Sequence, residues 1–272
     1  MRGASRASLS AAKERLSAVL AGGAAGQADE LGGELFAVVD LLDREAGLRR
    51  ALSDPSRDQE ARAGLAQALL ASQLATATME LLTELVTSRW SEPGDLADAA
   101  EQLAVLAIAE AADRDGKLDD LEDELFRFGR IVQGNRELRA ALSNQFAPAE
   151  GRRSLVTELV SGKVSDPALR LITQAAAHPR GRSLDAGLEM YANLAAELRE
   201  RLVAEVRVAV PLSAEQRTRL AAALVAAYGR DVHLNIVLDP EVLGGMSVRI
   251  GDQLISGSVA SRLAELRRRL AA

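Results

Sequence analysis

The sequence predicts a mainly α-helical protein, with tandem helical bundles at the N-terminus and a small α/β domain at the C-terminus. Three observations lead to this prediction. The chain has 272 residues, of which 48% are hydrophobic and 3% aromatic, and Ala, Leu, Glu and Arg dominate; this composition favours helices around an aliphatic core. A segment of 80 residues recurs 90 positions further along the chain. Near residue 201 the apolar period changes from helical to alternating, which indicates a second type of domain.

The repeat aligns residues 7–86 with residues 97–176 without a gap, and 20 of the 80 aligned positions are identical. The identities fall in short blocks: Glu34-Leu35-Phe36, for example, aligns with Glu124-Leu125-Phe126. Two helical segments rich in Ala and Leu share several residues by chance, but chance does not explain clustered matches at turns. We therefore interpret the repeat as an internal duplication.

Each copy is expected to contain several amphipathic helices. Apolar residues recur at helical spacing in both copies, namely Leu31, Leu35, Val38 and Leu42 in the first and Leu121, Leu125, Phe128 and Val132 in the second. A turn over residues 53–56 ends one helix, and Ser56 with Gln59 has the spacing of a capping box for the next. Residues 90–94 are the expected link between the copies, and a long helix from about 184 to 201 follows the second copy.

After residue 201 the pattern predicts the order strand–helix–strand–strand–helix. Alternating apolar residues indicate strands over 202–210, 232–238 and 246–250. Ser213 and Gln216 have the spacing of a capping box for the first helix, and Gly229 is expected to end it. An apolar stripe over 259–270 predicts the closing helix. The expected domains are 1–91, an extra copy of a helical bundle; 92–201, a second bundle; and 202–272, the α/β domain.

Composition excludes several classes of protein. The chain has 33 Lys and Arg against 39 Asp and Glu, a net charge of −6, which argues against nucleic-acid binding. The absence of cysteine excludes disulfides and thiolate metal sites, and two histidines leave little room for His-based zinc sites or Ser–His catalysis. No apolar run approaches the ~20 residues of a membrane span, and residues 1–16 lack the apolar stretch of a secretory signal. We expect a cytoplasmic chain that does not insert into the membrane.

Some short motifs resemble functional sites, but their details favour structural roles. Asp113-Arg114-Asp115-Gly116 begins like a calcium loop, yet glycine stands at position 4 and Lys117 at position 5, where an EF-hand requires an oxygen ligand. The acidic residues within 119–124 are expected to be a solvated helix start. Gly244-Gly245 lacks the spacing of a phosphate loop and is expected at the start of a strand.

The remaining candidates give no catalytic arrangement. Neither His178 nor His233 has a Ser, Asp or Glu partner at catalytic spacing. Arg267-Arg268-Arg269 complements the negative end of the last expected helix, or contacts an acidic partner. We therefore expect no catalytic residue, no metal site and no cofactor.

Residues 232–251 read Val-His-Leu-Asn-Ile-Val-Leu-Asp-Pro-Glu-Val-Leu-Gly-Gly-Met-Ser-Val-Arg-Ile-Gly. This stretch resembles the signature of the delta subunit of F-type ATP synthases, the family that includes the mitochondrial oligomycin-sensitivity-conferring protein. Every position that the signature specifies is satisfied, by Val232, Leu234, Leu238, Asp239, Val242, Gly244, Gly245, Met246, Val248, Arg249 and Gly251. The resemblance leaves open whether these residues serve the fold or contact a partner.

The resemblance covers about 92–272, because residues 96–200 are similar to the N-terminal helical bundle of the family. The usual Tyr-Ala-x-Ala-Leu opening is absent, and Glu101-Gln102-Leu103-Ala104 stands in its place. Residues 1–91 exceed the usual family length, which agrees with an extra copy of the bundle. Some family members are fused to the membrane-anchored b subunit, whereas this chain resembles the free-standing form.

The resemblance implies a non-catalytic stator subunit, present once per complex at the cytoplasmic face of the plasma membrane. It implies that the helical bundles bind alpha subunits of the catalytic head and that the C-terminal domain binds b subunits of the peripheral stalk. Proton-driven rotation would thereby be coupled to ATP synthesis. Two other classes stay open: a helical scaffold outside the ATP synthase, supported by the duplicated bundle, and an enzyme that uses the Gly244-Gly245 loop.

Overall fold

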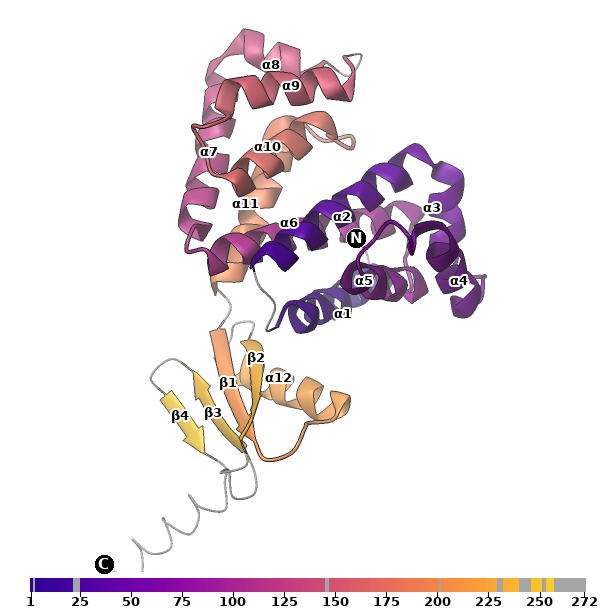
Figure 1. Ribbon diagram of the computed structural model, residues 1–272, viewed down its shortest axis with the longest axis vertical. Coiled ribbons are helices and arrows are strands. Elements are labelled where there is room, and N and C mark those ends of the chain that lie inside the picture. Colours follow the sequence, from indigo (N-terminus) through magenta and orange to yellow (C-terminus); the bar gives the residue numbers. More distant parts are fainter. Residues whose placement is uncertain are drawn as a thin grey trace, which may run out of the picture. The chain divides into compact units, whose positions relative to one another are not determined.

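The computed structural model describes residues 1, 3–21, 25–144, 147–200, 202–228, 232–239, 246–250 and 253–256. The chain divides into two compact units, Met1–Leu198 and Arg199–Ala272 (Figure 1). In the described ranges the first unit is helical, and the second combines a helix with a small sheet. The mainly helical fold with a C-terminal α/β domain is therefore confirmed.

The helices of the first unit follow the same plan twice. They are α1 Gly3–Leu20, α2 Ala25–Arg44, α3 Ala46–Ser53, α4 Gln59–Leu70, α5 Thr76–Thr87, α6 Pro93–Arg114, α7 Leu118–Gly134, α8 Arg136–Ser143, α9 Ala149–Val160, α10 Asp166–Ala177 and α11 Leu184–Glu200. Adding 90 to both bounds of α3, α4 and α5 gives the bounds of α8, α9 and α10. This regularity is consistent with a duplication. A common origin, and the division into domains at 91 and 201, stay predictions.

In the first copy, charged side chains bind both ends of α5. The Glu34 carboxylate accepts a hydrogen bond from the Ala75 backbone N–H at 2.9 Å, where α5 begins. The Arg62 guanidinium donates to the carbonyl oxygens of Val86 at 2.5 Å and Thr87 at 3.2 Å, where α5 ends. Backbone groups in the last turn of a helix have no partner within the helix, and each charge here complements the helix dipole. These two residues therefore hold α5 by its ends.

The second copy holds α10 in the same way, through residues 90 positions later. Glu124 accepts from the Ser165 backbone N–H at 3.0 Å. Arg152 donates to the carbonyl oxygens of Ala176 at 2.8 Å and Ala177 at 2.7 Å. Glu124 is thus partly buried at a helix end, and its expected place in a solvated acidic run is wrong. Both pairs of end-binding residues are among the identities of the repeat, so these identities are explained by one structural role.

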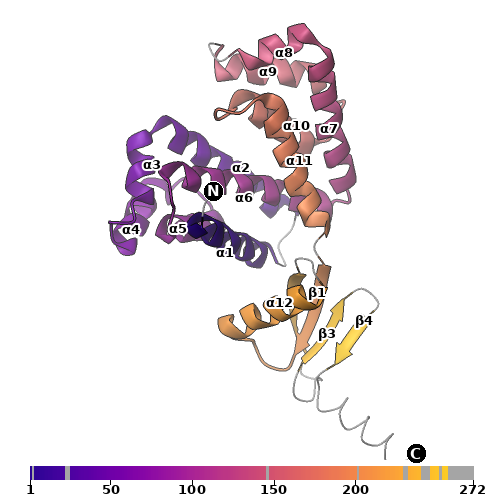
Figure 2. The ribbon, with the colours of Figure 1, turned by 180° about the vertical axis from the view of Figure 1, so that it is seen from behind.

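Helix α6 is the centre of the helical unit, where it lies alongside α2 (Figures 1 and 2). Its buried residues lie on every side: Asp95, Leu96, Ala97, Ala99, Ala100, Glu101, Leu103, Ala104, Val105, Leu106, Ala107, Ile108, Ala109, Ala111 and Ala112. A Cβ atom added to Gly32 of α2 would lie 2.6 Å from Ile108 Cγ1 and 3.0 Å from the Ala104 carbonyl oxygen. Glycine is therefore needed for α2 to approach α6 this closely.

The repeat offset shows why α6 is surrounded. Subtracting 90 from the bounds of α11, 184–200, gives 94–110, which lies within α6. Helix α6 therefore opens the second set of helices and also follows the first set, as α11 follows the second. A helix that serves two sets must be apolar on most of its surface, and the alanine-rich sequence of α6 meets this condition.

The C-terminal unit contains a four-stranded mixed sheet in its described residues, in the order β2-β1-β3-β4. Its elements are β1 Leu202–Val208, α12 Ala214–Tyr228, β2 Val232–Leu238, β3 Met246–Ile250 and β4 Gln253–Ser256. Strand β1 pairs parallel with β2 and antiparallel with β3, which pairs antiparallel with β4. Val206, Val208, Leu224 and Val248 form the small core. The three expected strands are present.

Local details both confirm and correct the sequence analysis. The capping box before α12 is confirmed, since Ser213 N–H donates to Gln216 Oε1 at 2.8 Å and Gln216 N–H to Ser213 Oγ at 3.2 Å. The other expected capping box is wrong: the N-cap of α4 is Asp58, and Ser56 instead donates its N–H to Asp54 Oδ1 at 2.9 Å. The ring of Pro55 fixes its φ angle, and the short side chain of Asp54 accepts a hydrogen bond from the backbone two residues later. Both properties favour this tight turn over a capping box that begins at Ser56.

Two strand predictions also need correction. Strand β1 ends at Val208, and Val210 is exposed, because Pro211 follows closely and cannot donate to a ladder. Strand β4 was missed, since its four residues are too few to show an alternating pattern. The expected closing helix over 259–270 and the expected helix end at Gly229 lie outside the described residues.

The end-binding arginines give the first testable prediction. Arg62 is 2% exposed, and Arg62→Met would leave the carbonyl groups at the end of α5 buried without a donor. We expect the free energy of unfolding to fall by about 3 kcal/mol, since an unsatisfied buried group costs ~1–3 kcal/mol and charged donors contribute more than neutral ones. Urea unfolding followed by circular dichroism measures this loss. The matched control is Arg57→Met, an exposed arginine 3.8 Å from Asp54, which should change stability by less than about 0.5 kcal/mol. Equal effects of both substitutions would contradict the assigned role.

Candidate functional site

The charged side chains in the residues that the structure describes do not gather into a metal centre. Across those ranges, no group of three or more His, Cys, Asp and Glu side chains could hold a metal ion. None of the described helices combines the length and the apolar character that crossing a membrane requires. The features with functional potential are therefore surfaces and the charged contacts that hold the helices together.

Six of the signature residues lie on the two strands that flank β1. Val232, Leu234 and Leu238 belong to β2, and Met246, Val248 and Arg249 belong to β3. Val232, Leu234 and Met246 pack against the C-terminal core, and Val248 is part of it. Val242, Gly244, Gly245 and Gly251 lie outside the described residues. The apolar signature residues with described side chains therefore contribute to the fold of this unit.

Two signature residues are polar. The Asp239 backbone N–H donates to the Val208 carbonyl oxygen at 2.9 Å, just after the end of β2. Its carboxylate lies 3.6 Å from Arg207 Nη1, so it forms an ion pair with β1. Arg249 is exposed on β3. Asp239 thus contributes to the sheet, whereas Arg249 is available to a partner.

The calcium-like motif is a turn between α6 and α7, as its residues indicated. Gly116 has φ +68° and its N–H donates to the Asp113 carbonyl oxygen at 2.9 Å. Asp119 and Asp120 lie in the first turn of α7, where negative charge complements the helix dipole. Arg267-Arg268-Arg269 lies outside the described residues.

A buried carboxylate on α6 binds the loop between α10 and α11. Glu101 is 2% exposed, and it accepts hydrogen bonds from Arg180 Nη1 at 2.6 Å, Arg182 Nη2 at 2.5 Å and the Tyr191 hydroxyl at 2.8 Å. Burial and the neighbouring Glu101 charge raise the pKa of Tyr191 well above its ordinary value, so Tyr191 stays a hydroxyl donor at neutral pH. The sequence analysis missed this role. The signal that could have revealed it is a glutamate among small and aliphatic residues in the middle of a long helix.

Arg180 extends this cluster to the first copy. It lies 2.7 Å from Asp43 of α2 and 3.0 Å from Asp98 of α6. Its backbone has φ 51° and the next residue, Gly181, has φ 75°, so the loop adopts two successive left-handed conformations. A non-glycine residue in this region is strained by about 1–3 kcal/mol, and three carboxylates around one guanidinium hold it there.

The face of α2 that meets α10 is also charged. Arg170 Nη1 lies 2.9 Å from Asp29, Gln174 donates to Asp40 at 3.2 Å, and His178 Nδ1 lies 3.1 Å from the same Asp40 oxygen. Burial raises the pKa of Asp40 and lowers the pKa of His178, in each case against the attraction between the two groups. His178 thus joins the two helical sets at the end of α10.

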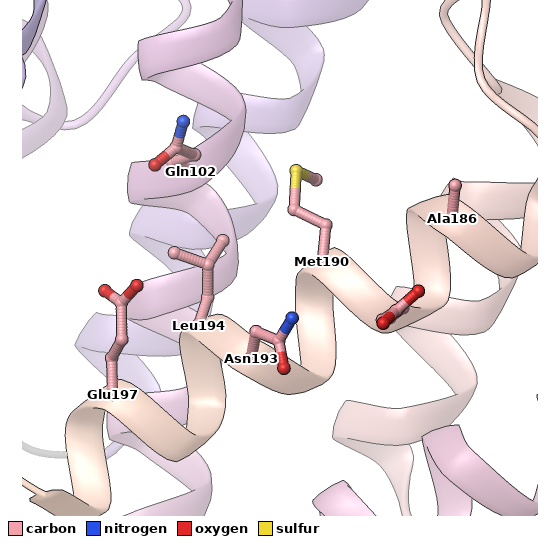
Figure 3. A pocket seen from close by; sticks show the side chains of 7 residues that line it. Gln102, Ala186, Met190, Asn193, Leu194 and Glu197 are labelled. Atoms are coloured by element: carbon pink, nitrogen blue, oxygen red, sulfur yellow. The ribbon is translucent and has the colours of Figure 1, made fainter.

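A shallow groove runs between α6 and α11 (Figure 3). Met190 and Leu194 provide its apolar part, and the polar side chains of Gln102, Asn193 and Glu197 surround them. Lys13 of α1 binds Glu197 at 2.8 Å beside it. A shallow surface of this kind suits contact with a protein better than the enclosure of a small ligand.

Comparison with known proteins gives a consistent result. The family model described as ATP synthase delta (OSCP) subunit matches residues 104–270. Full-length similarity is found to ATP synthase subunit delta of Streptomyces avermitilis, with 53% identity over 269 residues, covering 99% of this chain and 98% of the relative. The corresponding proteins of Streptomyces griseus subsp. griseus and Thermobifida fusca are 51% and 49% identical, and all of both chains is covered in each comparison. The N-terminal segment before residue 104 is therefore shared with these relatives.

The Glu101 cluster gives the second prediction. Glu101→Gln would remove the charge that compensates two arginines in a buried place, so we expect the free energy of unfolding to fall by about 3 kcal/mol or more. Urea unfolding measures the change. Glu110→Gln is the matched control on the same helix, because Glu110 pairs with Arg114 at 3.0 Å across one turn and is less buried; such pairs contribute about 0.5 kcal/mol. If Glu101→Gln were as mild as the control, the cluster would not stabilise the unit.

His178 gives a prediction about pH. Because burial lowers its pKa in the folded chain below the ordinary 6.5, protons bind more readily to the unfolded chain. The contribution of His178 is therefore present above pH 6.5 and is lost as the pH falls through the lowered pKa. Burial raises the pKa of Asp40 above its ordinary 3.8. The titration of Asp40 therefore changes the free energy of unfolding in the opposite direction, and it does so at lower pH. We expect His178→Gln to flatten the decrease in unfolding free energy between about pH 7 and pH 5, measured by urea titration. An unchanged slope would contradict this assignment. His233→Gln, which replaces the other histidine of the chain, is the control variant.

Proposed function

The chain belongs to the ATP synthase delta (OSCP) subunit family, and we propose that its two compact units hold different parts of the enzyme. It is a non-catalytic stator component of F-type ATP synthase. We propose that the helical part, residues 1–201, binds alpha subunits of the catalytic head. Residues 202–272 then bind b subunits of the peripheral stalk. One copy of the chain would join the head to the stalk in each complex.

The observation that supports this division is the separation of the chain at residues 198 and 199 into a helical unit and an α/β unit. Each unit has its own apolar core, so each can present an independent binding surface. Arg249, exposed on β3, is our candidate for a polar contact of the second unit with b.

The internal contacts of the helical unit suit a mechanical role. A stator subunit must resist the torque that the rotor applies to the head, so its helices must not slide against one another. Helices α5 and α10 are held at both ends by charged side chains, and the Glu101 cluster connects α6, α11 and the loop that precedes α11. Close-packed interiors with such connections deform little under load.

The proposed location follows from the proposed partners. The chain would lie at the cytoplasmic face of the plasma membrane, attached through the complex and not by a membrane span of its own. A helical scaffold outside the ATP synthase is the alternative, but similarity to ATP synthase delta subunits along the entire chain favours the stator role.

Fragments test the division of labour. We expect residues 1–200 to bind the alpha-containing catalytic head but not a soluble b fragment, and residues 202–272 to show the reverse preference. A small domain offers limited contact area, so the second interaction should be the weaker, although area alone does not set affinity. Pull-down of each partner with each fragment measures these preferences.

Function is tested in inverted membrane vesicles depleted of this subunit. The full chain should restore proton-driven ATP synthesis, whereas residues 1–200 alone should leave ATP hydrolysis by the head intact without restoring synthesis. Neither fragment should hydrolyse ATP by itself. Restoration of synthesis by residues 1–200 would show that the α/β unit is not the b contact.

A further inference from the structure

Helix α7 carries an apolar face that the rest of the described chain does not cover. Phe126 is 65% exposed and Ile131 is 59% exposed. Arg127 and Arg130 are exposed beside them, and positions 126, 127, 130 and 131 lie on one side of a helix. We call these four residues the α7 face.

Two of the four corresponding residues of α2, Phe36 and Asp40, contact the second set of helices, whereas Ala37, the counterpart of Arg127, is exposed. Phe36, the counterpart of Phe126, is 5% exposed and packs against Tyr191 with ring centroids 6.3 Å apart. Leu41, the counterpart of Ile131, packs against the core. Asp40, the counterpart of Arg130, contacts Gln174 and His178. The same helix face is thus an internal docking surface in the first copy and an open surface in the second.

One exposed apolar position is the same in both copies. Leu69 of α4 and its counterpart Leu159 of α9 are both exposed. An exposed leucine at that position is therefore a common property of both sets and needs no partner. The change from covered to open is found on the α2 and α7 faces.

The charged residues on α7 indicate what kind of segment could cover the α7 face. On α2 the Asp43 carboxylate binds the Arg180 guanidinium, and the Asp40 carboxylate contacts Gln174 and His178. On α7 an arginine replaces Asp40, and Arg127 replaces Ala37. Arg127 pairs with Asp123 of its own helix at 2.6 Å, but both side chains are exposed, and exposed pairs of this kind contribute little. A partner of the α7 face must therefore present carboxylates to Arg127 and Arg130, whereas the second set presents Gln174 and His178 to Asp40.

We propose that the α7 face docks an acidic amphipathic helix of another ATP synthase subunit. The occupant is a helix because the elements that cover the α2 face, α10 and α11, are helices. Its apolar stripe covers Phe126 and Ile131, and its Asp or Glu residues meet Arg127 and Arg130. This inference rests on the proposed stator function, and it adds an attachment point on the helical unit together with the charge of the segment that binds there.

The first experiment measures rebinding of the full chain to ATP synthase membranes depleted of this subunit. We expect the apolar variant Phe126→Ser/Ile131→Ser and the charge-reversal variant Arg127→Glu/Arg130→Glu each to weaken binding about tenfold or more, as loss of a central anchor does. Leu69→Ser, an exposed leucine on α4, is the control and should bind within about twofold of the unmodified chain. Melting temperatures should be similar for all of these chains, because the substituted residues are exposed.

The second experiment identifies the occupant. A photoreactive benzoylphenylalanine at position 126 of the full chain, irradiated in the rebound complex, should cross-link to an Asp- and Glu-rich helical segment of another subunit, located by mass spectrometry. Cross-linking to a basic segment, to a second copy of this chain or to nothing would overturn the inference. Unaltered binding of both double variants would also overturn it, while normal binding of the unmodified chain would leave the stator function standing. Failure of the unmodified chain to bind would overturn the stator function and this inference with it.

Discussion

The helical unit depends on one helix that is buried over most of its surface. Helix α6 belongs to both sets of helices, and its buried residues lie on all of its sides. A helix in this position cannot have a solvated polar face, which explains the run of alanines and aliphatic residues between Leu96 and Ala112. It also explains why Gly32 of α2 is a glycine, since α2 crosses so close to α6 that a Cβ atom would overlap Ile108. The two copies therefore share one core, although the sequence repeats as two separate segments.

Several charged side chains of the helical unit bind the ends of helices. Arg62 and Arg152 bind the last carbonyl groups of α5 and α10, and Glu34 and Glu124 bind the first N–H groups. Burying a charge is unfavourable unless it is paired or hydrogen-bonded, and free backbone groups at a helix end carry the same penalty. Each contact removes both penalties at once. These contacts account for two identities of the repeat, Glu34 with Glu124 and Arg62 with Arg152, that apolar periodicity alone does not explain.

The sequence predicted the parts of the fold that depend on apolar spacing. The helical plan of both copies and the strands at 202, 232 and 246 follow from periods that burial imposes on any amphipathic element. It failed where the decisive interaction joins distant residues or spans few of them. The short strand β4 has too little sequence for a period, and Ser56 is drawn away from its expected cap by Asp54. The role of Glu101 is not visible in its own segment, because its partners, Arg180, Arg182 and Tyr191, lie some 80 to 90 residues later.

The face of α2 meets a second set of helices, whereas the face of α7 does not, and this difference is expected where only two sets of helices are present. In a protein built from repeated sets, each set covers a face of its neighbour, and the terminal set has a face with no neighbour. Such a face becomes polar in proteins that end there, as repeat proteins show with their capping units. Helix α7 has arginines at the positions that align with Ala37 and Asp40, but it also has an exposed aromatic and an exposed aliphatic residue at the positions that align with Phe36 and Leu41. Complete conversion to a solvated surface would have replaced these as well. Retention of the apolar pair beside a reversed charge is the pattern expected of a surface that still binds a partner, but one of different charge from that bound by α2.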